Sequence, residues 1–209
     1  LLLCLQTNLS KKIKNGALLD QDFDKPQAFH NVAVARSGGL ASIISLSIFF
    51  ILYFFVFGEI LSDYIIISAL MFLIGFSEDL RISIRPTHRL ILMIISISLF
   101  IIFFSIDIKS IDLIFINNLM KNSLFETLFV LVCFLFIING ANLIDGFNGL
   151  LTIHLIIINL LLLFINLNSD QQNFSIIITA QIVILFSFLL FNFPKANMFL
   201  GDSGSYMFG

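Results

Sequence analysis

Acids, amides and glycines gather in four short polar segments of an otherwise apolar chain, and residues 139–149 form the richest of them. Within this segment Asn142, Asp145 and Gly149 are spaced three and four apart, so a helix would place them on one face. Asn148 extends the polar group. A turn explains one Asn-Gly or Asp-Gly pair. Several polar groups in register between apolar runs indicate a functional site, because unpaired buried amides and acids are costly.

A second segment ends in Gly-Asp-Ser-Gly-Ser at residues 201–205. It offers the carboxylate of Asp202, the hydroxyl of Ser203 and a flexible backbone at Gly201, whose N–H groups can form a nest for an anion. Mg²⁺ usually binds one or two carboxylates together with the phosphates of a substrate. Asp202 is therefore a candidate metal ligand, although Gly-Asp-Ser-Gly alone is a weak signal.

A third segment carries the adjacent acids Glu78 and Asp79, followed by Arg81, Arg85 and Arg89. Carboxylates at the end of an apolar helix are costly to desolvate unless a cation or another partner meets them. Two interpretations stay open. The acids form a salt-bridged helix end with Arg81 or Arg85, or they hold a proton or a metal while the arginines bind phosphate.

A fourth segment, earlier in the chain, contains Arg36 followed by the pair Gly38 and Gly39. Glycines at the mouth of a helix let backbone N–H groups approach an anionic ligand, and an arginine beside them could clamp a phosphate. A turn followed by a basic membrane anchor explains these residues equally well.

The elements that must position these segments are membrane helices. The chain is 59% hydrophobic and 11% charged, with a mean hydropathy of +1.06, whereas soluble domains carry about 25% charged residues. Lipid offers the backbone no hydrogen-bond partners, so we expect an all-α, polytopic bundle with about seven to eight transmembrane helices visible. The formal charge of −2 says nothing about nucleic acid, but no basic patch lies beyond the short loops, so we expect no nucleic-acid partner.

Apolar runs of spanning length alternate with the polar segments. The candidate spans are residues 40–57, 64–76, 90–106, 124–138, 150–167 and 175–193. Leu1–Leu5 is interpreted as the tail of an earlier span, and a further span is expected to begin at Tyr206. We interpret residues 1–209 as a single transmembrane domain that is truncated at both ends.

Basic residues set the orientation. Nine of the 11 Lys and Arg residues fall in alternate segments, and only Lys109 and Lys121 lie on the other side. The positive-inside rule makes the basic side cytoplasmic. The cytoplasmic loops predicted in this way are residues 10–38, 77–89, 139–149 and 194–205.

Taken in order, these loops resemble those of the polyprenyl-phosphate N-acetylhexosaminyl-1-phosphate transferases, the MraY/WecA-like glycosyltransferase family 4. Residues 30–39 are similar to the family's His-…-Pro-Arg-x-Gly-Gly segment, and Glu78-Asp79 to its Asp-Asp pair. Residues 142–150 resemble Asn-x-x-Asp-Gly-x-Asp/Asn-Gly-Leu. Residues 192–205 resemble Asn-x-Pro-…-Phe-x-Gly-Asp-x-Gly-Ser.

The resemblance implies an Mg²⁺-dependent enzyme, with Mn²⁺ as the alternative cation. It would transfer an N-acetylhexosamine-1-phosphate or another sugar-1-phosphate from a UDP-sugar donor to undecaprenyl or another polyprenyl phosphate, releasing UMP. This reaction initiates a lipid-linked cell-surface glycan. The implied location is the bacterial inner (plasma) membrane, multi-pass among membrane lipids, with the site on the cytoplasmic face; a homodimer is left open.

By position in the family, Asp202 would hold the metal with Glu78 and Asp79 alongside, and we favour Asp79 as the base. Asp145 would be a further catalytic carboxylate at the nucleotide pocket. The other residues expected to contact substrate are Asn142, Asn148, Phe199 (stacking on uracil), Arg36, Gly38, Gly39, Gly201, Ser203, Arg81 and Arg85.

Glu78 stands where the family usually has Asp, and Asn148 replaces an Asp common in the cell-wall branch. Both variants look like the branch that initiates O-antigen (lipopolysaccharide) or capsule-type glycans. Three rivals remain. CDP-alcohol phosphotransferases expect Ala-Arg after Asp-Gly, which Asp145-Gly146 does not continue. A transporter would place its carboxylates near the bilayer midplane, and an inactive homologue could serve as a scaffold.

Overall fold

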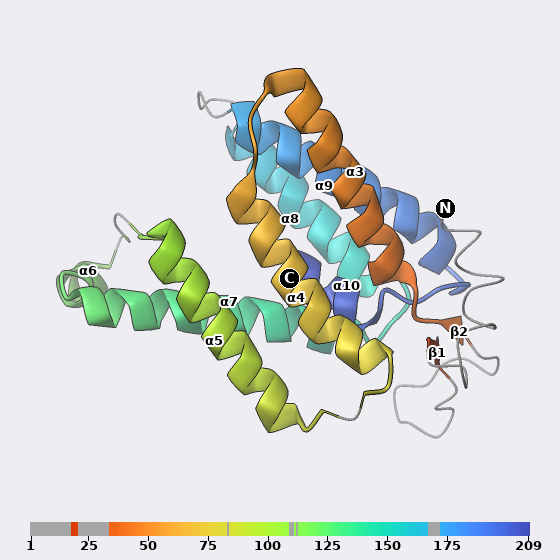
Figure 1. Cartoon of the computed structure of the whole chain (residues 1–209), viewed down its shortest axis with the longest axis horizontal. Helices are drawn as coiled ribbons and strands as arrows, with labels where there is room; N and C mark the ends of the chain where they lie inside the picture. The colour runs from red at the N-terminus through yellow and green to blue at the C-terminus, as the bar shows by residue number, and fades with distance from the viewer. Residues whose placement is uncertain (1–17, 21–33, 83, 109–110, 112, 167–171) are drawn as a thin grey trace.

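The computed structural model describes residues 18–20, 34–82, 84–108, 111, 113–166 and 172–209. Within them lie eight helices and one two-stranded antiparallel sheet (Figure 1). The helices are α3 (Gly38–Phe57), α4 (Ser62–Asp79), α5 (Pro86–Phe104), α6 (Ile114–Met120), α7 (Ser123–Ile144), α8 (Leu150–Asn166), α9 (Gln172–Asn192) and α10 (Gly201–Phe208). The strands are β1 (Leu19–Asp20) and β2 (Val34–Ala35). The expected helical fold is confirmed apart from this short sheet.

Four helices, α3, α5, α7 and α9, are long and apolar enough to cross a membrane, with 18-residue windows of mean hydropathy 2.1 to 2.5. α8 is a shorter apolar helix of 17 residues, and α4 carries acids at both ends. A polytopic bundle is therefore supported, whereas the predicted count of seven to eight spans exceeds the four found in the described residues. The span tail at Leu1–Leu5 lies outside those residues, as do His30 and the basic residues before it.

The helices extend further into the predicted loops than expected. α4 continues through Glu78 and Asp79, α7 runs to Ile144, and α10 begins at Gly201 rather than Tyr206. The loop predicted at residues 194–205 is therefore helical over its last five residues. Polar residues can extend an apolar helix when partners inside the protein satisfy them, and such partners meet these helix ends.

The short helix α10 occupies the centre of the bundle, where it packs against α4, α3 and α7 (Figure 1). Two apolar clusters flank it. The first joins α4, α5 and α7 and includes Met71, Met93 and the buried ring of Tyr206 from α10. The second joins α8 and α9 and includes Phe188 and Leu200. Because burial of apolar surface stabilises such packing, these clusters fix α10 between helices that are distant in sequence.

Glycine makes the crossing of α10 over α4 possible. A Cβ atom on Gly75 of α4 would lie 2.3 Å from the carbonyl oxygen of Asp202 and 2.6 Å from Cα of Ser203. Only a residue without a side chain allows the two backbones to approach so closely. Gly75 therefore determines how near the ends of α4 and α10 can come to each other.

We predict that Gly75→Ala lowers the free energy of unfolding by about 1–3 kcal/mol, because the added methyl group overpacks the helix crossing. The matched control is Gly140→Ala on α7, where an added Cβ meets nothing within 4 Å. The control should be neutral or gain up to about 1 kcal/mol from helix propensity. Thermal unfolding in detergent measures both, and equal melting temperatures would contradict the crossing described here.

Candidate functional site

The carboxylate of Asp79 is buried at the end of α4, where it accepts two backbone hydrogen bonds from α10. Its Oδ1 lies 3.0 Å from the nitrogen of Asp202, and its Oδ2 lies 2.9 Å from the nitrogen of Ser203. The first N–H groups of a helix lack partners within it and carry partial positive charge. Asp79 therefore caps α10 across the bundle. Burial raises the pKa of Asp79 to about 6 against the opposing effect of these hydrogen bonds.

Gly201 leaves the space that the Asp79 carboxylate occupies. Its backbone is left-handed, with φ of 76°, and a Cβ atom there would lie 2.6 Å from Oδ2 of Asp79. A side chain at this position would be strained and would push the carboxylate away. The structure places Gly201 against Asp79, and its predicted contact with substrate stays a prediction.

Asp202 stands in the first turn of α10 with both carboxylate oxygens engaged. Asn142 donates from Nδ2 to Oδ1 at 3.1 Å and also to the hydroxyl of Ser205 at 2.9 Å. Arg89 donates from Nη1 to Oδ2 at 3.1 Å. The structure thus brings the side chains of Asn142 and Asp202, two of the predicted site residues, into direct contact.

Arg89 also reaches Glu78, whose Oε2 lies 3.6 Å from the same Nη1 nitrogen. The guanidinium carbon of Arg89 lies 5.6 Å from the centre of the Tyr206 ring. The salt-bridged interpretation of the acid pair was therefore right for Glu78 but named the wrong arginines. Arg81 instead donates to the carbonyl of Leu19 at 2.8 Å, and Arg85 is exposed at the start of α5.

Asp145 lies directly after α7 and is half-buried. Burial raises the pKa of Asp145 well above its usual value, and the carboxylates of Asp202 and Asp79 add to the rise while Arg36 opposes it. These acids therefore form one electrostatic cluster. The predicted helical stripe does not extend past Asp145, because Gly149 adopts a left-handed turn with φ of 76° and Asn148 is exposed, donating to the carbonyl of Pro194.

Gly38 and Gly39 use their backbone N–H groups within the protein, and their predicted role toward substrate stays a prediction. They donate to the carbonyls of Phe199 and Leu200 at 3.0 and 2.8 Å. A Cβ atom on Gly39 would lie 2.2 Å from the hydroxyl of Ser203. The glycine pair therefore lets the start of α3 pack closely against the loop before α10 and against its first turn.

Three other predicted contact residues lie in or beside this packing. Arg36 forms an ion pair of 2.8 Å with Asp20 of β1, and Phe199 is half-buried with its nitrogen 2.8 Å from the carbonyl of Ala35. Ser203 is fully buried. Their predicted roles toward substrate stay predictions, and burial makes direct contact through the Ser203 side chain difficult.

Asn192 is a site-building residue that the prediction of contact residues left out. It is buried, donates from Nδ2 to the carbonyl of Met198 at 2.9 Å, and accepts from the nitrogen of Gly149. It thereby joins the segment after α7 to the segment after α9. Its place in the Asn-x-Pro motif was the available signal. Arg89 and Ser205 were also left out, and their residue types alone do not single them out.

The donor atoms fit a magnesium ion only in part. Among the described residues, no three His, Cys, Asp or Glu side chains converge as a ready-made metal centre. Mg²⁺ needs only one or two carboxylates when substrate phosphates and water complete its shell. Asp202 and Glu78 fit this requirement, because they already meet around one cationic nitrogen. Asp79 suits it less well, because the residue is only 1% exposed and each of its oxygens already accepts a hydrogen bond from α10.

Fold and site define a helical membrane protein with an acidic site at the meeting ends of its helices. Residues 61–209 match the family model "Glycosyl transferase family 4", and the chain belongs to this family. It is 30% identical to the phospho-N-acetylmuramoyl-pentapeptide-transferase of Clostridium perfringens (strain 13 / Type A), over 65% of this chain and 45% of the relative. It is 26% identical to the enzyme of the same name from Streptococcus pneumoniae (strain D39), over 93% of this chain and 61% of the relative. The chain thus spans about half the length of these relatives.

We predict that Asp79→Asn destabilises the fold by about 1–3 kcal/mol, because the amide NH₂ turns a donor toward an α10 N–H group and leaves both unsatisfied. The control is Glu78→Gln, which changes the adjacent, more exposed carboxylate. It should change stability by less than about 1 kcal/mol. Melting temperatures in detergent compare the two variants, and equal values would show that Asp79 does not hold α10.

Proposed function

We propose that this protein transfers a sugar-1-phosphate from a UDP-sugar to a polyprenyl phosphate and releases UMP. The proposal rests on the carboxylate of Asp202 in the first turn of α10. One of its oxygens accepts a hydrogen bond from Asn142 and the other accepts one from Arg89. A half-buried carboxylate fixed on both sides suits the binding of a cation and a diphosphate. Membership of glycosyl transferase family 4 supports the same chemistry.

In the proposed reaction, a phosphate oxygen of the lipid attacks the β-phosphorus of the donor. The new P–O bond forms as the bond from that phosphorus to the oxygen bridging it to the α-phosphate breaks, and this oxygen leaves with UMP. Mg²⁺, when bound, would stabilise the charge on the diphosphate. Asp202 and Glu78 would hold it, and Arg81 and Arg85 remain candidates for contact with phosphate. Such transfers depend chiefly on positioning and charge neutralisation.

The base hypothesis for Asp79 finds no support in this geometry. Both its oxygens accept hydrogen bonds from α10, and the residue is only 1% exposed. A phosphate nucleophile is already largely ionised near neutral pH, so the reaction needs little help from a base. We therefore assign Asp79 to positioning Asp202. Asp145 stays a candidate for the nucleotide pocket.

The placement of the site on the helices supports a lipid acceptor and a reaction at the membrane surface. The site lies at the ends of apolar helices, where the phosphate of a membrane lipid would also lie. The excess of Lys and Arg on this side supports a cytoplasmic face, and we propose the bacterial plasma membrane as the location. A homodimer stays a prediction.

Two donors compete within one chemical class, the UDP-linked N-acetylated hexosamines. The names of the relatives favour an N-acetylmuramoyl-pentapeptide donor. Glu78 and Asn148 were the residues behind the O-antigen or capsule interpretation, and the comparisons give that branch no support. We retain the shared class, UDP-N-acetylhexosamine or its muramoyl-pentapeptide derivative, and leave the branch to the assay.

We predict that the full-length protein releases UMP when given Mg²⁺, undecaprenyl phosphate and one of a panel of donors. The panel contains UDP-N-acetylhexosamines and UDP-N-acetylmuramoyl-pentapeptide. Asp202→Asn should lower the rate at least about 100-fold, because charge stabilisation at the transferred group is lost. Chelation by EDTA should abolish release. A fully folded protein that releases UMP from no donor would overturn the proposal and favour the transporter or the inactive scaffold.

A further inference from the structure

One nitrogen of Arg89 lies between two acids of the site. Nη1 is 3.1 Å from Oδ2 of Asp202 and 3.6 Å from Oε2 of Glu78. Two carboxylates that face a common point repel each other unless a positive charge separates them. The guanidinium of Arg89 supplies this charge, so it stands where a shared cation would neutralise both acids.

The position of Arg89 along α5 is unfavourable without these acids. It lies three residues after Pro86, in the first turns of the helix, and that first turn holds no acid. A positive charge near a helix N-terminus is destabilising because the helix dipole is positive there. The carboxylates of Asp202 and Glu78 compensate for this placement, and the face of the Tyr206 ring, 5.6 Å away, adds a cation–π contact.

The side chains of Arg89, Glu78 and Asp202 have fixed partners but remain accessible to water and to a cation that could replace the arginine. The exposed fractions are 22% for Arg89, 37% for Glu78 and 22% for Asp202, so water and ions reach them. Asn142 holds the other oxygen of Asp202 independently of Arg89. Loss of the arginine contact would therefore leave Asp202 oriented, which is the condition for exchanging one cation for another.

We propose that Arg89 is a tethered counter-ion that keeps Asp202 and Glu78 together in the empty site and yields them to a divalent cation. An arginine binds phosphate as readily as carboxylate. Once released, it turns to the phosphates of the donor that arrive with the cation. Arg89 is thus a positioning residue that couples cation binding to donor binding. The inference rests on the cation site of the proposed function.

Arg89 should affect cation binding differently in the donor-free and the donor-bound site. Without donor, Arg89 competes with the divalent cation for the same oxygens and weakens its binding. With donor, the phosphates bind the guanidinium, so this competition disappears. The affinity for the cation should therefore rise when a UDP-sugar is present, and by linkage the affinity for the UDP-sugar rises equally with the cation.

The test measures Mn²⁺ binding to the full-length protein by electron paramagnetic resonance, without and with a UDP-sugar. In the absence of donor, Arg89→Gln should bind Mn²⁺ about fivefold more tightly than the unchanged protein, a shift comparable to the loss of one partly exposed ion pair. With donor present, the variant should gain less affinity than the unchanged protein. Lys195→Gln is the matched control, because it removes one positive charge from an exposed side chain with no assigned part in the site and should leave donor-free binding unchanged.

Equal or weaker Mn²⁺ binding by Arg89→Gln would overturn the inference, as would a matching gain in Mn²⁺ affinity in Lys195→Gln. If Arg89→Gln fails to fold, Arg89→Lys decides the question. Because Arg89→Lys keeps the positive charge, its donor-free affinity for Mn²⁺ should stay within about twofold of that of the unchanged protein. Loss of the planar guanidinium should reduce the rise in Mn²⁺ affinity that the donor causes. A gain equal to that of the unchanged protein would contradict the inference. No step of the test needs transfer, so a failed transfer assay and a failed counter-ion are distinguishable.

Discussion

The hydrogen bonds from the α10 backbone to the Asp79 carboxylate are the contact on which the rest of the site depends. They join two helices that are more than 120 residues apart in the chain. A buried carboxylate is costly when unpaired, but the positive end of a helix compensates for its charge. The acid therefore stays at the end of α4 only while α10 is in place. In turn, α10 presents Asp202 in its first turn.

Everything else in the site is arranged around that junction. Gly75 and Gly201 remove the side chains that would separate the two backbones. Gly38 and Gly39 bring α3 against the loop before α10, and Asn192 ties that loop to the turn after α7. The result is a set of helix ends from distant segments that meet around one carboxylate, with Asn142 and Arg89 as its two side-chain partners.

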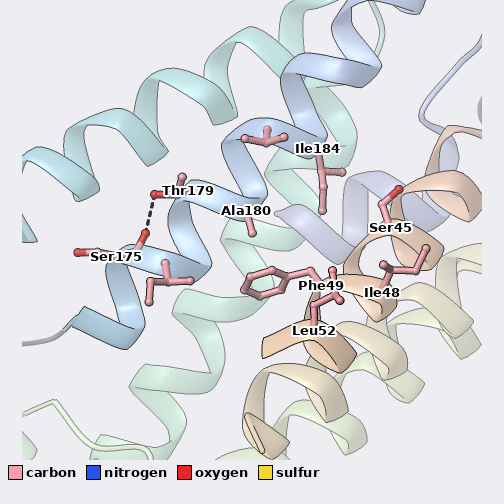
Figure 2. A pocket seen from close by; sticks show the side chains of 10 residues that line it. Ser45, Ile48, Phe49, Leu52, Ser175, Thr179, Ala180 and Ile184 are labelled. Carbon is pink, nitrogen blue, oxygen red and sulfur yellow. Dashed lines mark hydrogen bonds between the residues drawn. The ribbon is translucent and has the colours of Figure 1, made fainter. Parts of the chain in front are cut away.

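An apolar cavity among the described residues is separate from this site. It measures about 520 Å³ and lies between α3 and α9. Apolar side chains such as Phe49 and Ile184 dominate its lining, with the hydroxyls of Ser45 and Thr179 at its edge (Figure 2). Such a groove between two apolar helices suits hydrocarbon more than a nucleotide diphosphate. The polar chemistry therefore belongs at the helix ends and not in this apolar cavity.

Much of this arrangement could be predicted from the sequence because hydropathy decides where membrane helices form. Apolar runs in the sequence predict the helices α3, α5, α7 and α9, and the residue types at Asn142 and Asp202 indicate a polar site. The partners of each group could not be predicted. Arg81, Arg85 and Arg89 recur every four residues, and only the direction of α5 relative to α4 determines that Arg89 meets the acids.

For a related reason, the sequence does not show why a glycine stands at a given position. A glycine beside an anion and a glycine at a backbone crossing look identical in sequence, since both positions exclude a side chain. At Gly39 and Gly201 it is the tertiary approach of α10 that excludes one. Likewise, the acidity of Asp79 suggested catalysis or a metal, whereas its two backbone partners give it a structural role.

The most direct measurement is the calorimetric titration of a UDP-N-acetylhexosamine into the detergent-solubilised protein, with and without Mg²⁺, and into Asp202→Asn. If the helix ends around Asp202 form a cation-assisted diphosphate site, binding should require Mg²⁺ and should be lost in the variant while its melting temperature is retained. Binding that is equally tight without Mg²⁺, or that survives Asp202→Asn unchanged, would show that the donor binds elsewhere.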